Sequence, residues 1–127
     1  SGDWSSDVCS SDLDGFAGLV GGLGFANSAN IGEDCAVFEP THGSAPKYEK
    51  LDPSIVNPIA MILTACMMLE HVGEVEKAQK VREAIENVIA EGEVRTYDMM
   101  KLKGGPDVLK KGAASTTEMT DAILAHL

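Results

Sequence analysis

One short segment, residues 41–48, brings together an imidazole, an ammonium group, a phenol and several small residues (Thr-His-Gly-Ser-Ala-Pro-Lys-Tyr). The backbone amides of Gly43, Ser44 and Ala45 can approach a phosphate closely, because small side chains leave the peptide groups accessible. The imidazole of His42 can stack on a base or hydrogen-bond to a diphosphate. These residues fit a nucleotide-binding loop. On spacing alone they fit a loop histidine that caps a turn equally well.

A phenol and an ammonium group stand close together at two places in the chain. Lys47 precedes Tyr48 directly, and Tyr97 is followed four residues later by Lys101. Polar side chains of this kind are mostly exposed in folded proteins. Taken locally, the simpler interpretation of each of these residues is therefore a solvated position on the surface.

Two carboxylates outside these segments, those of Asp14 and Glu39, could bind a metal ion or a substrate. A single carboxylate is a weak signal, because a hard cation takes several oxygen ligands. The three cysteines (Cys9, Cys35 and Cys66) are odd in number and widely spaced, so they indicate neither a disulfide framework nor a zinc site. We therefore expect a reducing, cytoplasmic location.

The pattern around the polar segment predicts the elements that would position it. Residues 35–39 form a short β-rich run that Pro40 is expected to end, so the segment 41–48 follows as a loop. α/β proteins place ligands in loops at the carboxyl ends of strands. Upstream, residues 15–24 are apolar and glycine-rich, which predicts a closely packed helix that ends in a turn. Their G-x-x-G spacings resemble a dinucleotide fingerprint, but no predicted strand precedes them.

Two helices are predicted in the middle of the chain. Pro58 suits the first position of a helix whose residues 59–69 are apolar almost all the way round, which predicts a buried helix that ends at Gly73. Residues 74–91 predict an amphipathic helix that Gly92 closes. Its apolar stripe consists of Val75, Ala78, Val81, Ile85, Val88 and Ile89.

The last third of the chain predicts less regular structure. Residues 94–97 fit a short strand, and residues 103–112 read as a loop by composition. Ser115 and Glu118 have the spacing of a capping box, which would open a last helix that continues through Ala125.

The composition limits the classes of function. The 127 residues suffice for one modest domain, and 44% hydrophobic with 24% charged residues is typical of a soluble globular protein. The 10 basic and 20 acidic residues give a net charge of −10, which argues against a nucleic-acid or anionic-membrane partner. No run of about 18 apolar residues predicts a transmembrane helix. No charged and apolar leader is predicted at the start of the chain.

Residues 1–13 (SGDWSSDVCSSDL) differ from the rest, because they show no apolar periodicity and are rich in Ser and Asp. They fit a disordered tail or a translated sequencing adapter, whose end would read as Val8 to Leu13, and we expect them to lie outside the fold. The remaining elements are too few to cover the apolar helix at 59–69 on all sides. We therefore expect residues 14–127 to be part of a larger α/β domain.

Two stretches resemble the isocitrate/isopropylmalate dehydrogenase family closely. They are residues 18–48, with Glu-Pro-Thr-His-Gly-Ser-Ala-Pro, and residues 56–69, which begin Val-Asn-Pro-Ile-Ala. The resemblance extends from Asp14 to Leu127 and implies an α/β fold without a Rossmann fingerprint, of which this chain is the C-terminal part of the large domain. It also implies oxidation of a 2-hydroxy acid with NAD or NADP and a divalent metal (Mg²⁺ or Mn²⁺), usually followed by decarboxylation.

The resemblance implies a cofactor-binding role for the polar segment and for residues after it. It places His42 near the adenosine and Asn57 at the adenine edge. Lys47 and Tyr48 stand where NADP-using members often have Lys and Tyr against the 2′-phosphate, whereas NAD-using members commonly have Asp and an apolar residue. The implied set is His42, Gly43, Ser44, Ala45, Pro46, Lys47, Tyr48, Asn57, Tyr97 and Lys101.

The same resemblance bears on which cofactor is used. Tyr97 matches a second tyrosine of the phosphate pocket, and Lys101 stands where an arginine is frequent, so the charge is kept but the bidentate fork is lost. Ammonium and phenol donors suit a phosphate dianion, whereas an aspartate would repel it. NADP is therefore predicted, with NAD as the alternative.

The implied metal site is incomplete in this sequence. Asp14 aligns with the second aspartate of the family's G-D-x-x-S-D motif, and Ser10 stands where the first would be. Aspartates four residues apart share one helix face, as a shared metal ion requires. The arginines and the Tyr and Lys that act in the family's chemistry have no match here. No catalytic residue is therefore assigned, and this chain alone is expected to be inactive.

The predicted reaction of the intact protein is conversion of isocitrate to 2-oxoglutarate with NADP. The alternatives are an isopropylmalate, homoisocitrate or tartrate dehydrogenase, and a non-catalytic regulatory subunit, against which the intact cofactor residues argue. A standalone acidic helical domain without a ligand is a further possibility. The resemblance also implies a homodimer of the intact protein that acts on a small-molecule substrate, without nucleic-acid or membrane partners.

Overall fold

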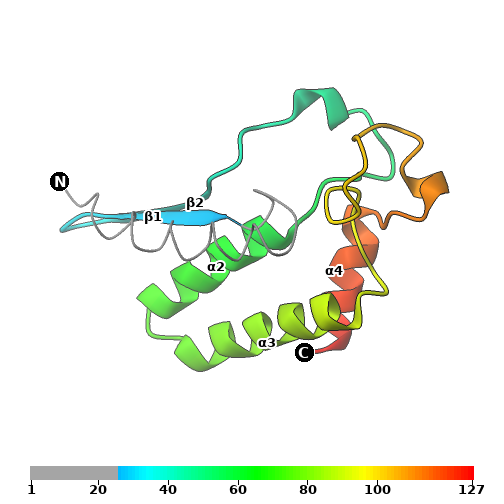
Figure 1. Cartoon of the computed structure of the whole chain (residues 1–127). Helices are drawn as coiled ribbons and strands as arrows, with labels where there is room; N and C mark the ends of the chain where they lie inside the picture. The colour runs from blue at the N-terminus through cyan, green and yellow to red at the C-terminus, as the bar shows by residue number, and fades with distance from the viewer. Residues whose placement is uncertain (1–25) are drawn as a thin grey trace.

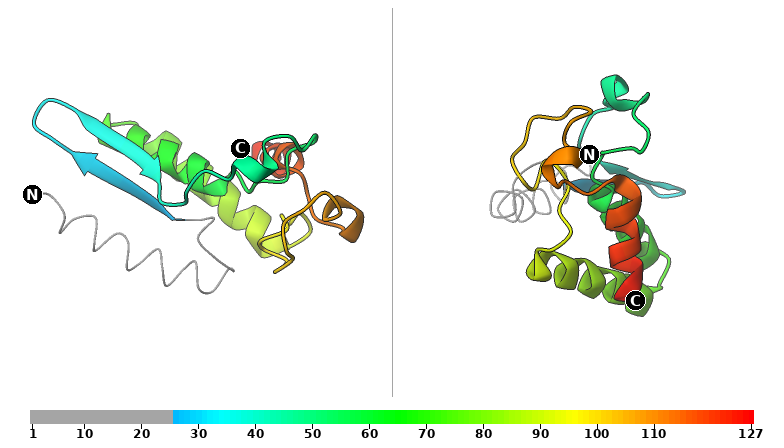
Figure 2. Two further views of the ribbon diagram at one scale, coloured as in Figure 1. Left: turned by 90° about the horizontal axis from the view of Figure 1, so that it is seen from above. Right: turned by 90° about the vertical axis from the view of Figure 1, so that its right-hand side faces the viewer.

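The computed structural model describes residues 26–127 of the chain, and their fold is of the α/β class. Figure 1 and the left view of Figure 2 place a β-hairpin at one end of the molecule and the loops around residues 100–112 at the other, with the helices between. The predictions for residues 1–13, for Asp14 and for a helix at 15–24 lie outside the described residues.

The hairpin consists of β1 (Asn27–Ile31) and β2 (Ala36–Pro40), which pair antiparallel from Asn27 opposite Pro40 to Ile31 opposite Ala36. The predicted strand at 35–39 is confirmed to within one residue, and Pro40 is its last position. Strand β1 was not predicted from the sequence. Its residues, Asn-Ser-Ala-Asn-Ile, have little intrinsic β preference, and the strand forms because β2 supplies a partner.

Helix α2 (Ile59–His71) begins and ends close to the predicted positions. Pro58 is the cap rather than the first helical residue, and Gly73 follows the helix with φ of +90°. The expectation of burial on all sides is wrong, because Met61 is 56% and Met68 46% exposed. The hairpin and the next helix contact the other faces of α2, and the methionine face stays open in the described part of the chain.

Helix α3 (Val75–Glu91) confirms the amphipathic prediction, and Gly92 caps it in the left-handed conformation with φ of +66°. Its buried residues are Ala78, Ala84, Ile85 and Val88. Val75, which the stripe included, is 57% exposed because it lies at the first residue of the helix, at the turn from α2.

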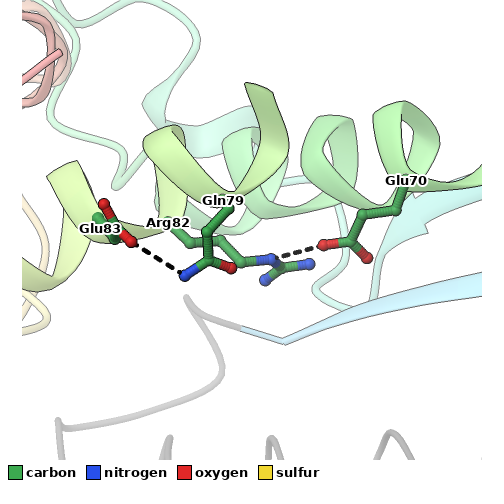
Figure 3. Close-up of polar contacts among 4 residues, drawn as sticks. All are labelled: Glu70, Gln79, Arg82 and Glu83. Carbon is green, nitrogen blue, oxygen red and sulfur yellow. Dashed lines mark hydrogen bonds and ion pairs between the residues drawn. The ribbon is translucent and has the colours of Figure 1, made fainter. Parts of the chain in front are cut away.

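Polar contacts run along the outer side of α2 and α3. Figure 3 shows Arg82 of α3 reaching Glu70 of α2, with 2.9 Å between Nε and Oε1, and Gln79 donating to Glu83 one turn later. Such exposed pairs contribute only a few tenths of a kcal/mol to about 1 kcal/mol each. The packing of the two helices therefore depends mainly on their buried apolar faces.

Helix α4 (Thr116–Ala125) confirms the predicted capping box. The Ser115 hydroxyl accepts from the Glu118 amide at 3.2 Å, and the Glu118 carboxylate accepts from the Ser115 amide at 2.7 Å. The first residue, Thr116, donates its amide to the Ser54 carbonyl at 2.8 Å and its hydroxyl to the Val56 carbonyl. The start of α4 thus fixes the segment that leads into α2.

Two apolar clusters hold these elements together. The first, which we call the helical core, lies between α2, α3 and α4 and consists of Ile59, Leu63, Ala84, Ile85, Val88, Met119 and Ile123. The second, the loop core, lies beneath the connecting segments and consists of Ile55, Val108 and Ala113, with Tyr48, Leu51, Tyr97, Met100, Leu102 and Leu109 packed against them.

The strand predicted at 94–97 is wrong. The Met100 amide donates to the Thr96 carbonyl at 3.1 Å, and the Leu102 amide to the Tyr97 carbonyl at 2.9 Å. These local bonds close a turn, so they take up backbone groups that a strand would offer to a neighbour. The predicted loop at 103–112 contains a short 3-10 helix, Leu109–Lys111. No helix in residues 26–127 is long and apolar enough to cross a membrane.

Candidate functional site

A cleft of about 370 Å³ opens where three separate segments meet. The segments are the loop after β2, the residues just before α2, and the turn after α3. In Figure 1 the chain leaves β2, passes through the short 3-10 helix Pro46–Tyr48 and returns to α2 past the loop that follows α3. The lining residues are His42, Gly43, Ser44, Ala45, Tyr48, Glu49, Ser54, Val56, Asn57, Tyr97 and Asp98.

Most of the residues predicted to bind a cofactor line this cleft, including His42, Asn57 and Tyr97 from three different segments. The exceptions are Pro46, Lys47 and Lys101, which do not line it. Pro46 and Lys47 are exposed on the 3-10 helix, and Lys101 is exposed beyond the turn with φ of +57°.

The ammonium group of Lys47 nevertheless lies beside the cleft. Its Nζ is 4.8 Å from the centroid of the Tyr48 ring, a cation–π arrangement. A positive charge therefore stands over the ring of Tyr48, a residue that lines the cleft and packs against the loop core.

Asn57 is 7% exposed, and both polar atoms of its side chain are engaged within the protein. Its Oδ1 accepts from the Ile59 amide at 3.0 Å, which satisfies a backbone donor at the start of α2. Its Nδ2 donates to Asp98 Oδ2 at 2.9 Å. One amide thus holds the first turn of α2 and joins two walls of the cleft.

Asp98 was not predicted from the sequence, and its carboxylate is bonded at both oxygens. Oδ2 accepts from Asn57, and Oδ1 accepts from the hydroxyl of Thr96, a residue with no exposed surface. The only signal in the sequence was its place directly after Tyr97. The lining residues Ser54 and Val56 carried no signal either, because their bonds with Thr116 span about sixty residues of chain. Glu49 was also not predicted to line the cleft.

Two tyrosines form one side of the cleft. The Tyr48 and Tyr97 rings meet edge to face, with centroids 5.8 Å apart and 66° between the planes. Burial raises the pKa of Tyr97 to about 12, and a hydrogen bond with Tyr48 and the negative charge of Asp98 act in the same direction. A phenol is protonated at neutral pH with or without this shift, and the shift extends the protonated range of Tyr97 to higher pH.

Gly104 fits against the outer end of the Tyr48 ring. A Cβ at this position would overlap the Tyr48 hydroxyl, whereas a Cβ at the neighbouring Gly105 would meet nothing within 4 Å. Neither glycine has a positive φ. Gly104 is therefore needed for the close approach of the loop to Tyr48, and the sequence analysis identified it only as part of a loop.

The charge of this region differs from that of the chain. Residues 95–113 contain five basic residues (Arg95, Lys101, Lys103, Lys110 and Lys111) against two acidic ones (Asp98 and Asp107), although the whole chain has a net charge of −10. None of these five basic residues lines the cleft, whose own lining contains the carboxylates of Glu49 and Asp98, so the excess of positive charge lies in the neighbouring loops.

The metal prediction is not addressed by the described residues. No group of three or more His, Cys, Asp and Glu within residues 26–127 is arranged to hold a metal ion, and Asp14 lies outside that range. Glu39 lies on β2, away from the lining of the cleft, and Cys35 and Cys66 are free thiols. The described site can bind and orient a ligand through aromatic, amide, imidazole and carboxylate groups.

Comparison with known proteins gives a consistent result. The family model described as isocitrate/isopropylmalate dehydrogenase matches residues 1–123. The chain is 61% identical over 83 residues to a 3-isopropylmalate dehydrogenase of Archaeoglobus fulgidus, covering 65% of this chain and 24% of that protein. It is 42% identical over 126 residues to an NADP isocitrate dehydrogenase of Thermus thermophilus, covering 99% of this chain and 22% of that protein.

A solved structure agrees with these relatives. The crystal structure of isocitrate dehydrogenase from Methylococcus capsulatus matches with a TM-score of 0.71 and 42% identity, covering 87% of this chain and 29% of that one. This chain therefore spans about a quarter of the length of the relatives it matches.

Proposed function

Because this chain belongs to the isocitrate/isopropylmalate dehydrogenase family, we propose that its cleft binds the adenosine end of NADP in an oxidoreductase that acts on a 2-hydroxy acid. The observation that carries the proposal is the meeting of His42, Asn57 and Tyr97 in one cleft, although they come from three segments of the chain. A largely apolar wall with a few placed polar groups is typical of cofactor sites.

The chemistry of the cleft favours a nucleotide with a 2′-phosphate. The Tyr97 phenol and the Lys47 ammonium group are donors of the kind that a phosphate dianion requires. NAD-using members of the family commonly have an aspartate at the position of Lys47, and that carboxylate would repel the phosphate. NAD is the alternative cofactor, and the carboxylates of Glu49 and Asp98 in the same lining could accept hydrogen bonds from ribose hydroxyls.

The bound cofactor would supply a hydride acceptor, its nicotinamide ring. The described residues would hold its other end. The imidazole of His42 and the small residues after it would pack against the adenosine and its phosphates, and the two tyrosines would close the side of the cleft. Holding the adenosine in this way positions the nicotinamide at a distance, because binding energy from remote parts of a ligand fixes the reacting part.

For the full-length protein we propose the conversion of isocitrate to 2-oxoglutarate, with isopropylmalate, homoisocitrate and tartrate as alternative substrates. The matched relatives include both an isocitrate and a 3-isopropylmalate dehydrogenase, so the substrate is left open between them. A homodimer, a site for Mg²⁺ or Mn²⁺ that includes Asp14, and a cytoplasmic location also belong to this proposal. A non-catalytic subunit of the family is the second candidate.

Isothermal titration calorimetry of the 127-residue chain with NADP, NAD and 2′,5′-ADP tests the cofactor proposal. We expect saturable binding of NADP and 2′,5′-ADP, and weaker binding of NAD by about tenfold, because a charge-assisted hydrogen bond to the phosphate is worth about 1.5–3 kcal/mol. Absence of saturable binding by all three ligands would overturn the proposal. Equal binding of NAD and NADP would leave the cleft assignment standing and remove the phosphate preference.

A further inference from the structure

We infer that Asp98 is a positioning residue of the cleft, which fixes the side-chain amide of Asn57 and thereby the distance between two of its walls. The inference rests on the proposed function in so far as the cleft binds a nucleotide. In this inference Asp98 acts through its contact with Asn57 and does not itself have to touch the ligand. The two residues are 41 positions apart in the sequence, so no local element would otherwise join them.

Three hydrogen bonds form a chain through this pair. The Thr96 hydroxyl donates to Asp98 Oδ1, Asn57 Nδ2 donates to Asp98 Oδ2 at 2.9 Å, and the Ile59 amide donates to Asn57 Oδ1 at 3.0 Å. The Ile59 amide can only donate and the ionised Asp98 carboxylate can only accept, which allows only one orientation of the Asn57 amide between them. The chain therefore connects the turn after α3 to the first turn of α2.

Burial of Thr96 and Asn57 raises the energetic cost of breaking these hydrogen bonds. Thr96 has no exposed surface and Asn57 is 7% exposed, so a broken bond could not be replaced fully by water. Hydrogen bonds are stronger where water is excluded, and a buried donor left without an acceptor is costly. Asp98 serves as the acceptor for both neighbours, so an apolar side chain at this position would leave the Asn57 amide nitrogen without that acceptor.

The structure also explains why Asp98 acts through Asn57. Both polar atoms of the Asn57 side chain are used within the protein, one on α2 and one on Asp98. A change at Asp98 would release the amide and let the turn that bears Tyr97 move away from the segment before α2. Because Tyr97 and Asn57 both line the cleft, its width would change without the removal of any lining aromatic.

Removal of the carboxylate and a reciprocal exchange of the two residues test this role. In Asp98→Leu both acceptor oxygens are lost and Asn57 Nδ2 has no partner, so we expect NADP affinity to fall about tenfold. In Asn57→Asp two carboxylates would face each other, with a similar or greater loss. In the double variant Asn57→Asp/Asp98→Asn the bond reverses, since the amide now at position 98 can donate to the carboxylate now at position 57, while the bonds from Thr96 and Ile59 are kept. We expect the double variant to bind NADP within about threefold of the wild-type chain, because the pair is again satisfied.

Asp107→Leu is the matched control, because Asp107 is an exposed acid in the same loop region that does not line the cleft. Wild-type affinity in Asp98→Leu would overturn the inference. A double variant Asn57→Asp/Asp98→Asn as weak as Asn57→Asp alone would also overturn it, because two residues that contact the nucleotide independently would not rescue each other.

A second measurement separates this inference from the proposed function. The side-chain amide signals of Asn57 in a ¹H–¹⁵N correlation spectrum report its bond to the carboxylate without any ligand. We expect them to shift in Asp98→Leu and to stay in place in Asp107→Leu. If the wild-type chain binds no nucleotide, the proposed function fails, and this spectrum alone decides whether Asp98 positions Asn57. Unshifted Asn57 signals in Asp98→Leu would contradict the inference.

Discussion

The helical core and the loop core both exclude water from apolar side chains, but they differ in how their backbones are satisfied. In the helical core, α2, α3 and α4 bond their peptide groups internally, so their side chains only have to pack. In the loop core, residues 94–113 rely on turns and side-chain bonds, such as that of Thr96 to Asp98. The candidate site lies against the loop core. In this protein, regular structure provides the support and irregular structure provides the chemical groups.

The largest expected effect is on the helical core. Met119 has no exposed surface and packs between α2, α3 and α4, so Met119→Ala should lower the free energy of unfolding by about 2–5 kcal/mol. Met61→Ala is the control, since Met61 is 56% exposed, and it should change stability by less than about 0.5 kcal/mol. Urea denaturation followed by circular dichroism measures both. Equal losses would show that the methionine face of α2 is covered.

The next effect belongs to the loop core. Gly104→Ala places a Cβ on the Tyr48 hydroxyl and should cost about 1–3 kcal/mol of stability, together with a measurable loss of NADP affinity as the ring moves. Gly105→Ala is the matched control, because space is open there and its φ is also not positive. Calorimetric titration and thermal melts of the two variants provide the comparison. If they behave alike, the contact between Gly104 and Tyr48 does not shape the cleft.

The charge beside the cleft should set the choice of cofactor. The double change Lys47→Asp/Tyr48→Ile replaces a cation and a phenol with an anion and an apolar side chain, so the ratio of NADP to NAD affinity should fall by at least about tenfold. Lys50→Asp makes the same charge change at an exposed residue that does not line the cleft, and its effect should be small. An unchanged ratio in the double variant would remove Lys47 and Tyr48 from the phosphate pocket.

The smallest effect concerns the pH dependence of the loop core. The pKa of Tyr97 is raised in the folded chain to about 12 from an ordinary value of 10.0, so the folded state holds this proton more tightly than the unfolded state. Its contribution to stability is complete below about pH 10 and is lost as pH rises through about 12. Tyr97→Phe removes this dependence, and urea denaturation between about pH 9 and 12 should show a shallower decline than in the wild-type chain. Parallel declines would contradict the assignment.

The helices were predictable because periodicity and caps are local signals. The bounds of α3 and α4 agree with the prediction to within one residue, since Gly92 and the pair Ser115 and Glu118 mark the ends in the sequence itself. The open methionine face of α2 was not predictable, because an apolar helix carries no sign of which face has a partner. The hairpin strand β1 was missed because its partner, rather than its composition, makes it a strand.

The site was predictable in part. The resemblance identified His42, Asn57 and Tyr97, and these residues meet in the cleft. Asp98 and Gly104 were missed, because their roles depend on contacts with Asn57 and with Tyr48, which lie far away in the sequence. The neighbours of a loop residue are determined by packing between segments that are distant in the sequence. A local sequence pattern therefore does not predict them.

The claim that the loop core binds the nucleotide and the helical core only supports it can be tested by a single titration. ¹H–¹⁵N correlation spectra of the 127-residue chain, recorded with increasing NADP, report on every backbone amide outside the prolines. We predict saturable shifts confined to residues 42–49, 54–57 and 97–98, with the amides of α3 unchanged. Shifts centred on α3 and the open face of α2, or no shifts at saturating NADP, would contradict it.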